Sequence, residues 1–291
     1  MKKKRLSKLI IALSVIVVLV ILSSTVFTLK NVELCFYASD NSLIEDLGAE
    51  LKHFTEEDTQ DIIDSGEFSF GDNIFFIQRQ LNIEKIEAKY PYIKIIGISA
   101  TFPDGFKIKA RERDALYRTP LSSGGFAILD EDLKVLEVVD SHSSVNKYDT
   151  ILINNLNLDT ISAGSFVSGG ADVDLLKDLG NEIFANNFSR ELAIHDIEEI
   201  RIVSASLTDN PALKTNNIII KTRHKCVDDK TIAGVTIEIE NAKINFETKI
   251  NKAFSIYSKY RKDGDVRSQA GTIKVYEDLV ASYSEIQIYS E

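Results

Sequence analysis

The first 30 residues carry the feature that most constrains how this chain can fold. Residues 9–29 form a run of 21 residues without a charged side chain, with five basic residues before it and Lys30 after it. At about 1.5 Å rise per residue, a helix of this length spans about 30 Å, the thickness of the hydrocarbon core of a bilayer. The run therefore predicts one transmembrane helix over 9–29. Because cationic flanks stay on the inner side, residues 1–8 are expected to be a cytoplasmic tail.

A cleaved signal peptide is the alternative to this anchor, since a basic start followed by an apolar stretch is typical of both. The run is longer than the usual apolar region of a signal peptide, and no A-x-A-like cleavage site ends it. The small residues Ser23, Ser24 and Thr25 keep the alternative open. We expect an uncleaved single-pass protein of the cell membrane, with its C-terminal domains outside the cytoplasm.

The part of the chain after this run is acidic. From Lys30 onward it has 29 basic and 44 acidic residues, a formal net charge of −15. Such a surface repels phosphate backbones, so nucleic-acid binding is not expected. Two cysteines, Cys35 and Cys226, are too few for a disulfide framework. About 260 residues exceed the usual size of one domain, which indicates two.

The first of these domains is expected over residues 30–113. Its patterns predict a strand at the start, then two helices, then a hairpin closed by a Pro-Asp-Gly turn; the acidic stretch 40–54 fits either an inserted helix or a loop. The order strand, helix, helix, strand, strand favours an α+β domain with two helices on one face of a small sheet. The predicted elements are strand 32–36, helices 55–65 and 78–90, and strands 93–101 and 106–113.

Four short stretches of this domain resemble a known family. They are Gly71–Phe75, Tyr90–Ile93, Phe102–Ile108 and Arg111–Arg113, and in order and spacing they are similar to the POTRA domain of the FtsQ/DivIB cell-division proteins. A short basic tail, one span and a directly attached POTRA domain is also the layout of that family. The sequence departs from the family pattern at Ala100, where an arginine is usual, and at Ala115, where a proline is usual.

The remaining residues predict a second, mixed β-rich domain over 114–276, with a helix and a strand near its end, followed by a C-terminal tail over 277–291. The tail is expected to be loosely ordered, although 283–289 alternates enough for a strand. The predicted strands are 125–130, 133–138, 151–158, 197–207, 217–222, 235–240 and 271–276, and the predicted helices are 171–187 and 246–260. The expected fold class is thus α+β, with an N-terminal transmembrane helix, a POTRA domain and this second domain.

No pattern in the chain indicates catalysis. The four histidines are scattered, and H-E-x-x-H, paired-cysteine and Gly-x-Ser-x-Gly elements are missing from the sequence. His224 and Cys226 share one side of a predicted strand, but two ligands without a second pair are poor evidence for a metal site. The prediction is a protein that is not an enzyme, with no catalytic, cofactor-binding or metal-ligating residues and no cofactor.

A protein without a catalytic site is expected to bind other proteins. The edges of its sheets are the candidate binding sites, because an edge strand can accept a strand from another chain. In the FtsQ/DivIB family the last strand of the second domain docks FtsB-like partners. The stretch that best matches this strand is Thr272, Ile273, Lys274, Val275 and Tyr276.

The resemblance implies a divisome scaffold at the division septum. Its partners would be FtsB/FtsL-like (DivIC-like) single-pass division proteins and septal wall synthases, and its role would be to organise and regulate septal cell-wall synthesis. The alternative is a membrane-anchored surface receptor or adhesion module that has a POTRA-like fold.

Overall fold

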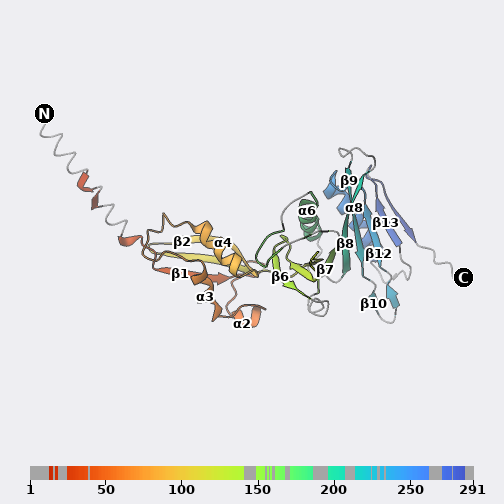
Figure 1. Ribbon diagram of the computed structural model, residues 1–291. Coiled ribbons are helices and arrows are strands. Elements are labelled where there is room, and N and C mark those ends of the chain that lie inside the picture. Colours follow the sequence, from red (N-terminus) through yellow and green to blue (C-terminus); the bar gives the residue numbers. More distant parts are fainter. Residues whose placement is uncertain are drawn as a thin grey trace, which may run out of the picture. The chain divides into compact units, whose positions relative to one another are not determined.

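The structure is a computed structural model of the chain that divides into two compact units, Met1–Arg113 and Asp114–Glu291 (Figure 1). The structure describes residues 13–15, 17–18, 25–38, 40–140, 149–154, 156, 158, 161–167, 171–185, 196–206, 214–223, 225–227, 230–232, 234–261, 271–276 and 278–285.

The expected fold class is corrected at the N-terminus. Of the predicted transmembrane helix over 9–29, only residues 13–15, 17, 18 and 25–29 are described. Within the described residues, no helix has both the length and the apolar character needed to cross a membrane. A span needs about 20 consecutive helical residues, and the described pieces of this run are each shorter than that. The described part of the chain is also richer in strands than in helices.

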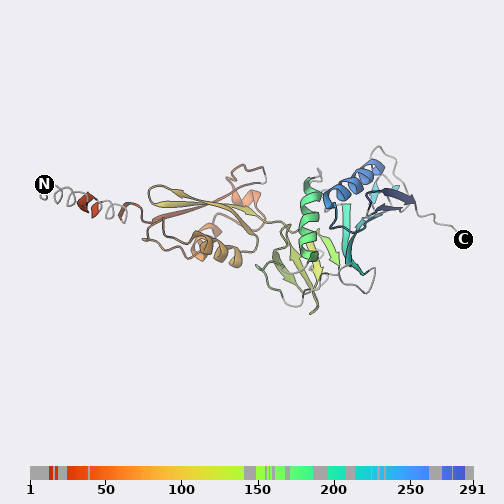
Figure 2. The ribbon, with the colours of Figure 1, turned by 90° about the horizontal axis from the view of Figure 1, so that it is seen from above.

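The first unit is a three-stranded sheet with helices packed on it (Figure 2). Strand β3 is central, with β1 parallel to it on one side and β2 antiparallel on the other. The order of elements is the predicted one, with the short helix α2 inside the acidic stretch. The bounds are β1 Asn31–Phe36, α2 Leu47–Glu50, α3 Asp58–Ser65, α4 Arg79–Lys89, β2 Ile93–Thr101 and β3 Gly105–Glu112.

The ends of the helices of this unit follow local signals in the sequence. The Asp58 carboxylate accepts hydrogen bonds from the backbone N–H and the hydroxyl of Thr55, at 2.8 and 2.9 Å, and this fixes the start of α3. The inner face of α4 carries a polar residue. Leu81 is 50% exposed, and the polar Asn82 is buried in its place beside the fully buried Ile86.

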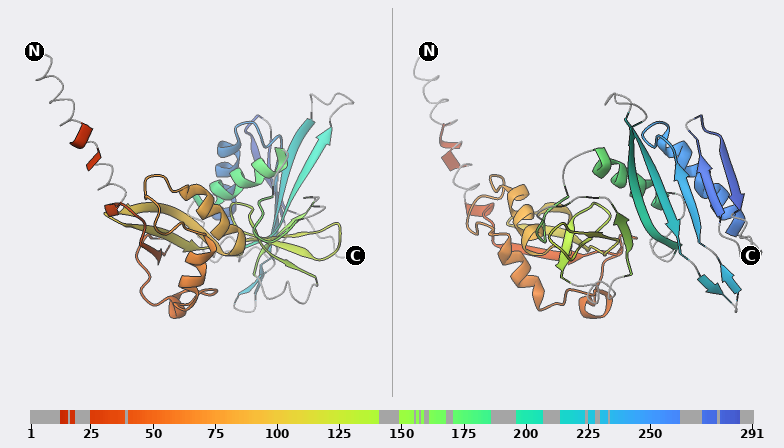
Figure 3. Two further views of the ribbon diagram at one scale, coloured as in Figure 1. Left: turned by 60° about the vertical axis from the view of Figure 1, so that its left-hand side comes forward. Right: turned by 45° about the vertical axis from the view of Figure 1, so that its right-hand side comes forward.

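The second unit is built on a nine-stranded sheet with the order β14-β13-β12-β9-β8-β7-β4-β5-β6. The helices α6 and α8 pack against each other, and α8 lies against β12, β13 and β14 (Figure 3). The elements are β4 Tyr117–Pro120, β5 Phe126–Leu129, β6 Val135–Val139, β7 Ile151–Asn154, α6 Ala171–Ala185, β8 Ile197–Ser206, β9 Lys214–Thr222, β12 Val235–Ile239, α8 Phe246–Arg261, β13 Gly271–Val275 and β14 Ala281–Glu285. The short strands β10 Lys225–Val227 and β11 Lys230–Ile232 pair only with each other among the described residues.

The core of the second unit lies between the sheet and its two helices. Isoleucines of the central strands, such as Ile200, Ile220 and Ile237, are fully buried with Leu176 of α6 and Ile250 of α8. Strands that bury one face against helices carry β-branched residues at alternate positions, which is the pattern that predicted them.

Candidate protein-interaction surfaces

The described residues hold no cluster of three or more histidine, cysteine, aspartate or glutamate side chains that could bind a metal ion. His53 stacks on Tyr92 with 3.8 Å between ring centroids, and its backbone N–H donates to the Glu112 carboxylate at 2.7 Å. This histidine therefore links β3 to the segment after α2. The other three histidines lie outside the described residues. That the protein is not an enzyme stays a prediction.

Glu199 on β8 is a carboxylate whose pKa lies well below its ordinary value. Burial alone would raise its pKa, but hydrogen bonds from Asn154, Lys221 and Arg201 lower it to about 2. The donor–acceptor distances are 2.5 Å to Asn154 Nδ2, 2.9 Å to Lys221 Nζ and 2.7 Å to Arg201 Nη2. This carboxylate joins the strands β7, β8 and β9. None of its three partners is a nucleophile or a histidine. We interpret it as a structural group.

The predicted partner-binding stretch, Thr272–Tyr276, forms strand β13 and the residue after it. This strand is parallel to β12 on one side and antiparallel to β14 on the other, so it is the second strand from the edge. The prediction assumed that the last strand of the domain lies within 271–276, whereas the structure adds β14 from the region expected to be a tail. Whether these five residues contact a partner stays a prediction, but they do not form an open edge.

The side chains of β13 are engaged on both faces of the sheet. Ile273 and Val275 are fully buried in the core. On the opposite face Lys274 Nζ lies 2.9 Å from Glu240 Oε1 and 5.2 Å from the centroid of the Tyr276 ring. The hydrogen bond to Glu240 raises the pKa of Lys274. The stretch is therefore a structural part of the sheet.

Strand β14 is the outermost strand at this end of the sheet. The Tyr276 N–H donates to the Val280 carbonyl at 2.8 Å, so these residues form a hydrogen-bonded pair at the turn between the two strands. Such pairs alternate along an antiparallel ladder. From the register, the backbone groups of Ser282 point toward β13, and those of Ala281 and Tyr283 point away from it. Within the described residues, no strand pairs with this outer side.

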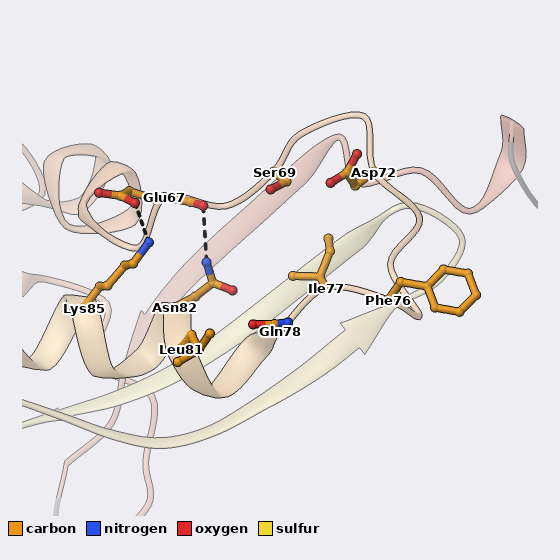
Figure 4. Close-up of a pocket in the computed structure, with 9 residues that line it drawn as sticks. All are labelled: Glu67, Ser69, Asp72, Phe76, Ile77, Gln78, Leu81, Asn82 and Lys85. Atoms are coloured by element: carbon orange, nitrogen blue, oxygen red, sulfur yellow. Dashed lines mark hydrogen bonds and ion pairs between the residues drawn. The ribbon is translucent and has the colours of Figure 1, made fainter.

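A shallow hollow of about 280 Å³ lies between α4 and the loop that precedes it in the first unit (Figure 4). Asn82 Nδ2 donates to the Gly66 carbonyl at 2.6 Å, and Lys85 forms an ion pair with Glu67. The Phe76 ring lies at the rim and points away from the hollow. These two contacts tie α4 to the segment that follows α3.

Of these features, the sequence indicated the strand β14 but not the partners of Glu199. Alternation over 283–289 was the signal for β14, and it pointed to the correct region without its bounds. The three partners of Glu199 come from strands that meet only in the folded sheet, so the sequence held no local signal for them. No family model matches the chain, and no curated protein is significantly similar to it.

Proposed function

We propose that this protein is a non-enzymatic scaffold of the bacterial division machinery, similar to FtsQ/DivIB. It binds FtsB/FtsL-like partners at the septum and so helps to organise septal wall synthesis. The observation that carries the proposal is the outer side of β14, at the end of a large sheet, with which no strand pairs in the described part of the chain. The stretches between Gly71 and Arg113 that resemble the POTRA domain support the choice of partner class.

An open strand edge supplies binding energy through its backbone. Ala281 and Tyr283 each direct an N–H and a carbonyl outward, so an added strand gains about two to four hydrogen bonds here. At a net value of about 0.5–1.5 kcal/mol each, these bonds give modest affinity. Side-chain contacts must therefore provide the selectivity between partners.

The edge is fixed in position before any partner binds. Leu279 adopts a positive φ of 67° in the turn that precedes β14, and its carbonyl accepts a hydrogen bond from Lys252 on α8. A strand that is already ordered loses less conformational entropy on binding, which favours association. The acidic surface of the chain, with a net charge of −15 from Lys30 onward, favours a basic partner segment.

A proline on β14 tests this docking mode. In Tyr283→Pro the outward-pointing N–H is lost while the ladder to β13 is kept, because proline is tolerated where the N–H faces away from the sheet. We expect it to lose co-purification with single-pass division proteins from solubilised membranes. Tyr283→Ala is the matched control, since it removes the side chain and keeps the N–H. Equal recovery of these proteins with a folded Tyr283→Pro variant would contradict the docking mode.

The septal role needs a test of its own. A fluorescent fusion is expected to concentrate at the division site, and depletion is expected to impair septum formation. Even distribution of the fusion, together with normal septa after depletion, would exclude a division scaffold. Capture of a soluble extracellular ligand in place of single-pass proteins would support the receptor alternative.

A further inference from the structure

Four phenylalanines gather at the end of the first unit where β1 begins. The rings of Phe27, Phe75 and Phe102 contact one another, with centroid separations of 5.5 Å for Phe27–Phe75, 6.2 Å for Phe27–Phe102 and 5.9 Å for Phe75–Phe102. Phe76 follows Phe75 in the chain. We call these four residues the aromatic tip. They come from three segments: the approach to β1, the loop before α4, and the turn between β2 and β3.

The aromatic tip is exposed although its rings are large and apolar. The exposed fractions are 59% for Phe75, 84% for Phe76 and 62% for Phe102. Single exposed apolar residues are common, but contiguous exposed aromatic groups mark binding surfaces. Because exposed apolar rings are costly to hydrate, we expect the aromatic tip to contact another molecule or a membrane.

Backbone hydrogen bonds hold the segments of the tip together. The Ile74 N–H donates to the Phe27 carbonyl at 2.9 Å, and the Leu29 N–H donates to the Asp72 carbonyl at 2.8 Å. At the third segment, the Lys30 N–H donates to the Asp104 carbonyl at 2.8 Å. The rings are thus presented by an ordered backbone, so that little conformational entropy is lost when they enter an apolar environment.

We propose that the aromatic tip inserts into the interfacial region of a lipid membrane. The chain itself points to this occupant, because the uncharged run of residues 9–29 includes Phe27 and leads directly into the tip. Five basic residues precede that run and suit anionic headgroups. Phenylalanine rings occur on the apolar faces of proteins that enter the boundary between headgroups and acyl chains. The tip is carried on loops and a turn, and protruding rings fit a deformable lipid surface better than a preformed protein groove.

The charges beside the tip are compatible with this contact. Lys30 Nζ lies 3.2 Å from the Asp104 carboxylate, so the acid nearest to Phe102 in sequence has a cationic partner. Asp72 is exposed and adds a negative charge near the rings. Insertion at the level of the headgroups leaves these groups hydrated, whereas deep insertion would not.

Tryptophan fluorescence tests the proposal with the full chain, because its sequence contains no tryptophan. Phe76→Trp places a reporter on the tip. Leu43→Trp is the matched control, because Leu43 is 50% exposed and pairs with Tyr37 at the opposite end of β1. At about 3.3 Å per residue, the six residues of β1 separate the two ends by about 20 Å. The vesicles contain phosphatidylcholine and phosphatidylglycerol, with bromine atoms on shallow acyl positions.

The Phe76→Trp reporter should shift its emission to shorter wavelength on vesicles and be quenched several-fold more strongly than the Leu43→Trp reporter. Adding Phe75→Ser and Phe102→Ser to the Phe76→Trp chain should reduce the quenching to the level of the control. Equal quenching of the two reporters in vesicle-bound protein would overturn the proposal. So would an unshifted Phe76→Trp emission that changes only when membrane proteins are added, because the occupant would then be a protein.

Discussion

Replacing Glu199 with glutamine is expected to destabilise the second unit by an amount that the structure allows us to estimate. The pKa of Glu199 is about 2, against an ordinary value of 4.5. At about 1.4 kcal/mol for each tenfold change in proton affinity, this difference corresponds to about 3 kcal/mol. Its partners Lys221 and Arg201 are 43% and 38% exposed, so solvent screening reduces the effect to about 2 kcal/mol.

The pH dependence of this contribution has a definite sign. Because the pKa of Glu199 is lower in the folded state, its contribution is complete above the unfolded value of 4.5 and is lost as the pH falls toward about 2. The difference in the free energy of unfolding between the wild-type chain and Glu199→Gln should therefore be largest at neutral pH. It should shrink steadily between about pH 4.5 and pH 2.

Hydrogen exchange in increasing urea, followed by mass spectrometry of peptides from β8 and β9, measures the unfolding of this unit separately from the first. Glu238→Gln is the matched control. Glu238 is 40% exposed, and its carboxylate lies 3.9 Å from Lys274 Nζ, so its loss should cost less than about 0.5 kcal/mol. A loss in Glu199→Gln that is the same at neutral and acidic pH would refute the electrostatic explanation.

Three further substitutions test other contacts by the same exchange measurement. Asn82→Leu should cost about 1–3 kcal/mol in the first unit, because the buried Gly66 carbonyl loses its donor at 2.6 Å. Lys249→Met should cost about 2–4 kcal/mol in the second unit, because the fully buried Lys249 ammonium bonds two backbone carbonyls at 2.7 and 3.0 Å. Gly125→Ala should destabilise β5 and β6 more than Gly124→Ala: both glycines have positive φ, but only at Gly125 would a Cβ meet a backbone oxygen, at 2.4 Å.

Local patterns predicted most elements of the second unit because each pattern depends on residues close in sequence. The helix predicted over 171–187 is Ala171–Ala185, and the strand predicted over 235–240 is Val235–Ile239. Alternation and helical spacing reflect which face is buried, and this information is already present in one segment.

Features that depend on distant segments could not be predicted in this way. The turn between β5 and β6 has Leu133 at a φ of 59°, where glycine is usual. The Asp130 carboxylate stabilises this turn by accepting from the Lys134 N–H at 2.7 Å, and Leu133 is itself fully buried. Burial of a leucine side chain in the core outweighs the modest strain of a left-handed backbone. Asn82 lies on the inner face of α4 for another reason, because its amide donates a hydrogen bond to the Gly66 carbonyl at the end of α3.

The position of β14 changes how the predicted docking stretch should be tested. A proline at Ile273 or Val275 would remove a backbone donor from an interior strand whose side chains are fully buried, so it would disrupt the fold of the second unit before it revealed anything about binding. Substitutions that act only on binding must lie on the outer side of β14, where Ala281 and Tyr283 direct their backbone groups away from the sheet. Only on this outer side can a substitution change the edge of the sheet without disturbing the core of the second unit.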